Sequence, residues 1–112
     1  MRLESKTILE DVRLAASNIQ EFIADISFED YSSDELIQSA VERQFEIIGE
    51  ALNRLLKVDP DTLSKINHYQ RIISFRNILI HAYDVIENTV VWDVIQDDLP
   101  ELYDNILNLL QE

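Results

Sequence analysis

The sequence predicts an all-α protein, a bundle of four to five packed helices. Among its 112 residues there are one Gly and two Pro, and 46% of the residues are apolar. So few turn-forming residues leave little room for a many-stranded sheet. Apolar residues instead recur at alternating steps of three and four, the period of an amphipathic helix. The length suits one hydrophobic core, so we expect a single domain over residues 1–112.

The first two helices are predicted from their apolar stripes. One is expected over residues 5–26, and the stretch Ser27–Tyr31 after it is expected to be a loop. The second helix is expected over residues 32–57, because Ser32 and Glu35 fit a capping box. It contains Gly49 in its interior, where glycine costs about 1 kcal/mol relative to alanine. The expected reason for keeping it is the close approach of another helix.

The second half of the chain predicts three further helical segments. A short one is expected over residues 61–66, where Pro60 suits the first turn. The next, over residues 69–81, is apolar nearly all round and is therefore expected to be the central helix of the bundle. Asn88 is expected to cap a last segment, which Pro100 kinks or restarts.

The charge balance argues, on composition alone, against a nucleic-acid ligand. The chain has 22 acidic and 9 basic residues, a net charge of −13, and no Lys or Arg after Arg76. A field of that sign spread evenly over the surface would repel phosphates, so no DNA ligand is expected. The chain has no Cys and no apolar run long enough to cross a membrane, which predicts a cytoplasmic protein.

One polar cluster stands out on the most apolar helix, at Arg76, Asn77, His81 and, just beyond, Tyr83. In a helix, Asn77 and His81 share a face because they are four residues apart. Arg76 and His81 differ by about 140° around the axis and about 7.5 Å along it. A long arginine side chain can still reach the space in front of His81.

These residue types suit chemistry at a phosphorus centre. Arginine is a permanent cation whose fork matches phosphate oxygens, and histidine carries protons near neutral pH. Cleavage of RNA by its own 2′-hydroxyl needs a base, an acid and a cation, but no metal. A structural interpretation stays open, with Arg76 paired to Glu46 or Glu50 and His81 a hydrogen-bonded core residue. For a lone histidine the structural interpretation is the commoner one. The combination of Arg76, His81 and Tyr83 at this spacing, however, is seldom expected by chance.

The motif resembles that of the HEPN-domain toxins of the HepT type. Two other segments share the resemblance, Phe45–Ala51 upstream and Leu99–Leu102 with Trp92 downstream, so it covers almost the whole chain. It implies a helical, dimeric, metal-independent endoribonuclease encoded beside a minimal nucleotidyltransferase antitoxin. By family analogy, tRNA is the implied substrate class. No cofactor is implied.

The resemblance assigns a role to each residue of the motif. Arg76 and His81 match the family's catalytic pair, and Asn77 matches the polar residue that commonly follows the arginine. Tyr83 matches the tyrosine to which the antitoxin attaches adenosine monophosphate, which would silence the nuclease. We expect no metal site, because His68 and His81 are thirteen residues apart with no carboxylate between them.

A homodimer would resolve two difficulties. One histidine cannot easily be both acid and base in a turnover, whereas a two-fold axis would bring two copies of His81 to one cleft. Arg71 and Arg76 from both subunits would also make a positive island that binds RNA in an acidic molecule. The main alternative is a non-catalytic helical module that binds and positions a nucleotidyltransferase partner. A third possibility is a dimer without any partner.

Overall fold

The computed structural model describes residues 1–81 and 86–112, and every regular element in them is helical. The long helices are α1 (Leu3–Phe22), α3 (Glu35–Val58), α5 (Tyr69–His81) and α7 (Leu99–Leu110). Shorter elements lie between them: α2 (Phe28–Ser32), α4 (Pro60–Leu63), α6 (Asn88–Asp93) and the π-helical turn η1 (Val94–Asp98). The predicted all-α fold is confirmed. None of the described helices is long and apolar enough to span a membrane.

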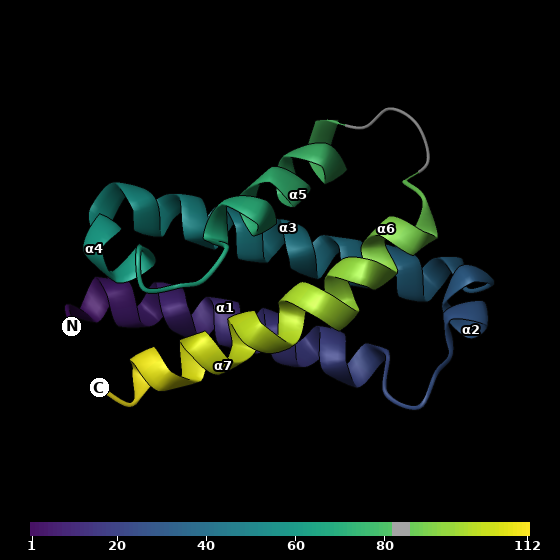
Figure 1. Ribbon diagram of the computed structural model, residues 1–112, viewed down its shortest axis with the longest axis horizontal. Helices are drawn as coiled ribbons and strands as arrows, with labels where there is room; N and C mark the ends of the chain where they lie inside the picture. Colours follow the sequence, from purple (N-terminus) through teal and green to yellow (C-terminus); the bar gives the residue numbers. More distant parts are fainter. Residues whose placement is uncertain (82–85) are drawn as a thin grey trace.

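Helix α3 forms the centre of the bundle. It packs against α1 along its length, against α5 on another side, and against the short helices α2 and α4 (Figure 1). Helix α7 lies across α1, and the core between these helices includes the fully buried Leu9, Phe45 and Leu102. The fold therefore consists of α1, α5 and the short helices α2 and α4 around α3, with α7 closing the side of α1.

The prediction that residues 69–81 form the central helix is wrong, although the predicted boundaries match α5. Only Ile72 and Phe75 of this helix are buried, whereas Ile78 is 51% and Ile80 37% exposed. A helix that is apolar on every side need not be covered on every side by its own chain, and α5 leaves part of its apolar surface exposed. In Figure 1 the C-terminal end of α5 extends beyond the body of the bundle.

The predicted loop Ser27–Tyr31 is wrong, because this stretch begins the one-turn helix α2. Its capping box is formed by Ser27 and Asp30, each side chain accepting from the other residue's backbone N–H at 3.1 Å. The predicted box of Ser32 and Glu35 is therefore wrong as well. Helix α3 is capped instead by Asp34, whose carboxylate accepts from the N–H of Ile37 at 3.1 Å.

Two turns of the chain use the left-handed backbone region without glycine. Helix α1 ends at Phe22, earlier than predicted, and Asp25 in the following turn has a φ of 63°. His68, exposed in the turn before α5, has a φ of 58°. Asp and His enter this region more readily than most residues, which suits a chain with a single glycine.

A buried hydroxyl joins the start of α1 to the end of α3. The hydroxyls of Ser5 and Thr62 each donate to the Asp59 carboxylate at 2.6 Å, and the N–H of Thr62 donates at 3.2 Å. Asp59 thereby caps α4, which covers residues 60–63 rather than the predicted 61–66. The hydrogen bonds from Ser5 and Thr62 lower the pKa of Asp59 to about 2.

The last part of the chain is continuously helical from α6 through η1 to α7, and Pro100 lies at the start of α7. The π-helical turn η1 precedes α7, and Pro100 lies in the first turn of α7, which confirms the predicted restart. The predicted cap at Asn88 is wrong: Asn88 is the first residue of α6, and its N-cap Glu87 forms no side-chain capping bond. Trp92 of α6 packs against Tyr31, with ring centroids 5.4 Å apart.

Candidate active site

The first half of α5 is held against the C-terminal helices. Asn67, two residues before α5, donates from its N–H to the Asn105 side chain at 2.8 Å and from its amide to Glu101 at 3.0 Å. Arg71 forms an ion pair with Asp98 of η1 at 2.8 Å. These contacts fix where α5 starts and how it lies on the bundle.

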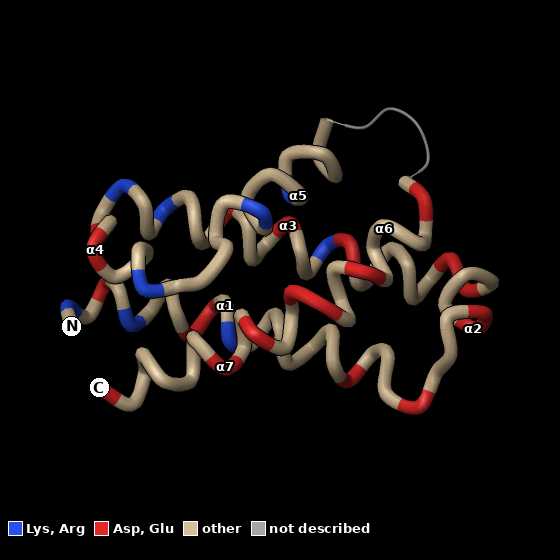
Figure 2. Tube along the Cα trace, viewed as in Figure 1, with Lys and Arg blue, Asp and Glu red and all other residues tan. Residues whose placement is uncertain are grey.

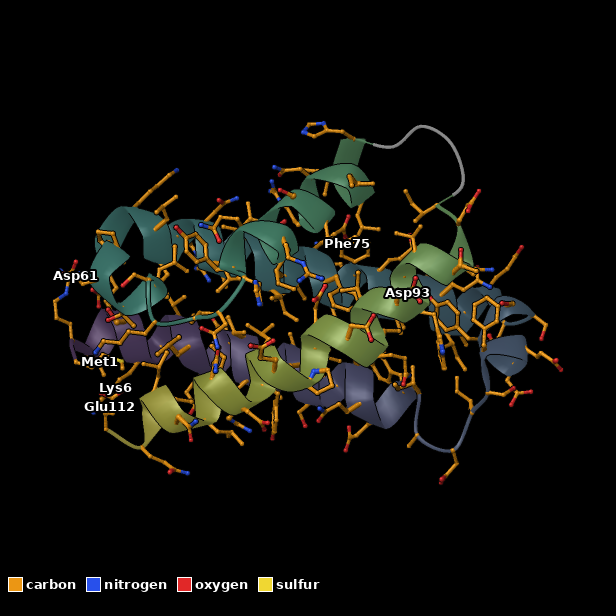
Figure 3. All side chains as sticks on the ribbon, viewed as in Figure 1. Met1, Lys6, Asp61, Phe75, Asp93 and Glu112 are labelled. Carbon is orange, nitrogen blue, oxygen red and sulfur yellow. The ribbon has the colours of Figure 1, made fainter. Side chains whose placement is uncertain are left out.

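The middle of α5 packs on α3. Phe75 meets Phe45 edge-on, with ring centroids 5.1 Å apart, and in Figure 3 it lies on the side of α5 that faces the bundle. Phe75 is the last of the buried residues of α5. The motif begins at the next residue, and beyond it only the partly buried Leu79 still packs against the core from α5.

Arg76 crosses α3 at Gly49. Gly49 is buried, and a Cβ atom built there would overlap Cβ and Cγ of Arg76 and lie 3.3 Å from its Cδ. The expected close approach of a helix at Gly49 is confirmed, and the approaching group is the motif arginine itself. The stem of Arg76 occupies the space that any other residue at position 49 would fill.

The guanidinium of Arg76 is only partly engaged by its neighbours. The side chain is 21% exposed, its Nη1 donates to Oδ1 of Asn77 at 3.0 Å, and its Nη2 lies 3.9 Å from Glu50. At 3.9 Å the contact with Glu50 is an ion pair without a direct hydrogen bond. Nε is buried, without a hydrogen-bond partner among the described residues, and is therefore closed to an incoming anion. The donors available for an anion are those of Nη1 and Nη2 that Asn77 does not occupy.

The structural interpretation of the motif expects an ion pair at Arg76 and a buried histidine at position 81, and the structure has only the first. The pairing of Arg76 with Glu50 is present, although long. His81, however, is the last residue of α5 and is exposed, so in this chain it is not a core histidine. Asn77 is exposed too, on the face that the four-residue spacing predicts it shares with His81.

That face is an exposed polar stripe along the outside of α5. Gln70 and Ser74 extend the line of Asn77 and His81 at steps of four and three, and all four are exposed. The stem of Arg76 instead faces α3, and its guanidinium reaches the stripe at Asn77, to which it donates a hydrogen bond. The exposed Ile78 and Ile80 flank the stripe.

The other residues expected at the site have different outcomes. Tyr83 lies outside the residues that the structure describes. Arg71 pairs with Asp98 of η1, whereas Arg76 packs against α3, so the two arginines do not form one positive patch within the chain. Within residues 1–81 and 86–112, no three side chains of the metal-ligating kinds lie together in a way that could hold a metal ion.

The acidic charge is unevenly distributed. In Figure 2 the Lys and Arg residues gather mainly at the end of the molecule where α1 begins and α3 meets α4, whereas the charged residues of α2, α6 and α7 are all Asp or Glu. The prediction from composition assumed an evenly spread negative field. Arg54, Lys57 and Arg76 line one open pocket, so a region near Arg76 can accept an anion although the whole chain carries −13.

Gly49 is a residue of the site that the sequence does not assign to it, whereas Glu50 is one of the two partners that the structural interpretation offers for Arg76. The signals at Gly49 are its place in a helix interior and in the segment Phe45–Ala51 that carries the family resemblance. Neither signal names Arg76 as the group that needs the space. That pairing depends on how α5 crosses α3, which spacing along the chain does not give.

Comparison with known proteins identifies the family. The family described as "Ribonuclease HepT-like" matches residues 12–109, which include the Gly49 contact and the motif. The chain is 34% identical over 105 residues to a protein of Thermococcus cleftensis named probable ribonuclease HepT, covering 91% of this chain and 92% of that protein.

Two further relatives have similar coverage. A candidate RNase of Caldanaerobacter subterraneus is 33% identical over 104 residues, which is 93% of this chain and 92% of that protein. Another, from Methanocaldococcus jannaschii, is 32% identical over 97 residues, 87% and 88% of the two chains. No solved structure matches the chain. The family match and these full-length relatives show that the chain belongs to the HepT-like ribonuclease family.

Proposed function

We propose that the chain is the toxin of a toxin–antitoxin pair, a metal-independent endoribonuclease that cleaves RNA in the cytoplasm. The observation that supports it most is Arg76: in a member of this family, its side chain is 21% exposed, and among the described residues its Nη atoms form one hydrogen bond, to Asn77. Such a group is suited to bind a phosphate. The exposed His81 follows five residues later on the same helix. The substrate class that the family resemblance implies is tRNA.

The proposed reaction is transfer of the phosphate to the neighbouring 2′-oxygen. One imidazole removes the proton of the 2′-hydroxyl as that oxygen attacks phosphorus, and the bond from phosphorus to the 5′-oxygen breaks. A protonated imidazole gives its proton to the leaving 5′-oxygen. Arg76 offsets the negative charge that develops on the phosphate oxygens. The products are a 2′,3′-cyclic phosphate and a 5′-hydroxyl end.

We place this reaction at a cleft between two copies of the chain. Base and acid act together in one turnover, and each copy supplies one His81. The polar stripe on α5 and the exposed Ile78 and Ile80 beside it support this arrangement, because a second α5 would cover them. Asn77, which accepts from Arg76, would help to orient the guanidinium in the cleft.

Silencing would come from a minimal nucleotidyltransferase antitoxin that adenylylates Tyr83. The adduct would add a negative phosphate and a bulky base two residues after His81. It would exclude the substrate phosphate by bulk and by charge repulsion, as phosphorylation does. A Tyr83→Phe variant should therefore remain toxic in the presence of the antitoxin and ATP, and its mass should stay unchanged. Silencing of this variant, or adenylylation of it at another residue, would contradict the assignment.

The enzymatic claim is tested with the purified chain and RNA in the presence of EDTA. The wild type should produce fragments with 2′,3′-cyclic phosphate ends, and Arg76→Ala or His81→Ala should lower the rate by at least about a hundredfold. Arg13→Ala removes the same charge from an exposed ion pair with Glu10 and should cleave normally. Cleavage that EDTA abolishes, or that both site variants retain, would refute the mechanism.

The alternative is a non-catalytic module that positions a nucleotidyltransferase partner. Its support is the ion pair of Arg76 with Glu50, which gives the arginine a structural role in this chain. Expression in cells separates the two. Growth arrest and RNA fragmentation by the intact chain, lost in both site variants, favour the enzyme. An intact chain that causes neither effect favours the module.

A further inference from the structure

An open groove runs beside Arg76 between α3 and α5. It has a volume of about 680 Å³ and is lined by Ile47, Glu50, Asn53, Arg54, Lys57 and Arg76. Three of these side chains are cations and one is a carboxylate, in a molecule whose net charge is −13. The groove is therefore a locally positive surface that continues from the motif arginine, and we call it the α3–α5 groove.

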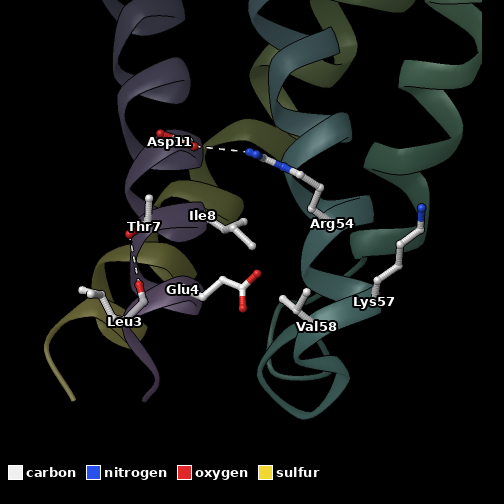
Figure 4. A pocket seen from close by; sticks show the side chains of 8 residues that line it. All are labelled: Leu3, Glu4, Thr7, Ile8, Asp11, Arg54, Lys57 and Val58. Atoms are coloured by element: carbon white, nitrogen blue, oxygen red, sulfur yellow. Dashed lines mark hydrogen bonds and ion pairs between the residues drawn. The ribbon is translucent and has the colours of Figure 1, made fainter.

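The two cations contributed by α3 differ in how they are engaged. Arg54 crosses to α1, where its Nη2 lies 3.3 Å from the carboxylate of Asp11. Figure 4 shows this contact, and it shows Lys57 pointing away from α1. Lys57 forms no ion pair with any residue that the structure describes, and it is exposed. Of the two, Lys57 has the freer charge for an incoming anion.

The spacing along α3 separates the cations into two binding positions. Arg76 crosses α3 at Gly49, and Lys57 follows eight residues later, about 12 Å along the axis. An extended polyanion with regularly spaced charges matches two cations anchored that far apart along α3, and Asn53 between them offers an uncharged donor and acceptor.

We propose that the α3–α5 groove holds the RNA strand next to the cleavage point, with Lys57 contacting a phosphate near the one held by Arg76. This inference rests on the proposed ribonuclease function and adds the path of the substrate to it. A positive groove that follows the backbone is the usual way in which proteins hold single-stranded nucleic acid without reading its sequence. The groove assigns to Lys57 the second binding role that the sequence suggested for Arg71.

Binding is measured with the full-length His81→Ala chain, so that RNA is held without being cut. Fluorescence anisotropy with a labelled single-stranded RNA should show severalfold weaker binding when Lys57→Ala is added. The slope of log affinity against log salt should become shallower by about 0.7, the value for one phosphate contact on a single strand. Lys65→Ala is the matched control: it removes the same charge from an exposed ion pair with Glu112 outside the groove.

Cleavage kinetics provide the second measurement. Lys57→Ala in the otherwise wild-type chain should raise KM and leave kcat close to its original value, because Lys57 does not contact the reacting atoms. If Lys57→Ala and Lys65→Ala have the same RNA affinity and the same KM while the wild type cleaves RNA, the proposed role of the groove is wrong and the proposed function is unaffected. A wild-type chain that neither binds nor cuts RNA overturns both. Weaker binding of an acidic partner protein with unchanged RNA binding would also overturn the inference.

Discussion

At the scale of single residues, Gly49 determines where the guanidinium of Arg76 can lie. Any side chain at position 49 would overlap the stem of Arg76, so the arginine would have to leave its place against α3. In a helix interior, alanine is otherwise favoured over glycine by about 1 kcal/mol. The local preference of the backbone and the needs of the site therefore oppose each other at this position.

This conflict predicts that Gly49→Ala lowers kcat for RNA cleavage by at least about tenfold while helical content is kept, since a small displacement of a positioned group is costly. Circular dichroism and single-turnover cleavage would measure the two effects. Ser39→Ala, an exposed change on the same helix, should leave both unchanged. A Gly49→Ala chain with wild-type kcat would show that the position of Arg76 does not depend on the glycine.

Tyr31 carries a hydroxyl that the fold does not satisfy. The residue is fully buried against Trp92, and its oxygen has no hydrogen-bond partner among the described residues. Burial raises the pKa of this hydroxyl well above its usual value. Tyr31→Phe should therefore leave the free energy of unfolding unchanged or raise it by up to about 1 kcal/mol, measured by urea titration. A loss of more than about 1 kcal/mol would reveal a partner for the hydroxyl.

At the scale of elements, Asp59 joins three helices through one carboxylate. Hydrogen bonds from Ser5 and Thr62 lower its pKa to about 2, from the ordinary value of 3.8. A lowered folded-state pKa means that the ionised carboxylate stabilises the fold above about pH 4 and that this contribution is lost as the pH falls toward 2.

The corresponding prediction concerns acid unfolding. The wild type should lose stability between about pH 4 and pH 2. The Asp59→Asn variant should be less stable at pH 7, but its stability should change less over that pH range. Thermal unfolding followed by circular dichroism across the range would measure both curves. Parallel curves for the two proteins would mean that the acid sensitivity comes from other carboxylates.

The elements also show what a sequence can predict and where it fails. Helix α5 was predicted with its observed ends, because the turn at Asn67 and His68 interrupts the apolar period clearly. The start of α3 was misplaced because the chain contains two successive capping sequences, and only tertiary packing decides that Ser27 and Asp34 are the caps.

The candidate site was also predictable only in part, because spacing along the chain does not show which element each residue contacts. Spacing placed Asn77 and His81 on one face, which the exposure of both residues matches. It could not show that Arg76 packs onto Gly49, or that Arg71 pairs with Asp98, because both facts depend on which neighbour each side of α5 meets. Periodicity identifies an apolar side of a helix but not the element that covers it.

At the scale of the whole molecule, the outer face of α5 has no partner within the described chain. It carries His81 and the polar stripe, with the 51% exposed Ile78 beside them. If a second copy covers this face, Ile78→Glu should weaken the dimer and RNA cleavage together, because it buries an unpaired charge in the interface. Leu3→Glu is the control, since Leu3 is 80% exposed at the start of α1, far from the end of α5 in Figure 1.

The central claim, a ribonuclease site completed by two subunits, is tested most directly by size-exclusion chromatography with light scattering and RNA cleavage assays on each fraction. The account predicts that EDTA-resistant activity elutes at twice the chain mass of 13.1 kDa and that Ile78→Glu shifts the protein to the monomer with loss of activity. A stable monomer with full nuclease activity would contradict the account.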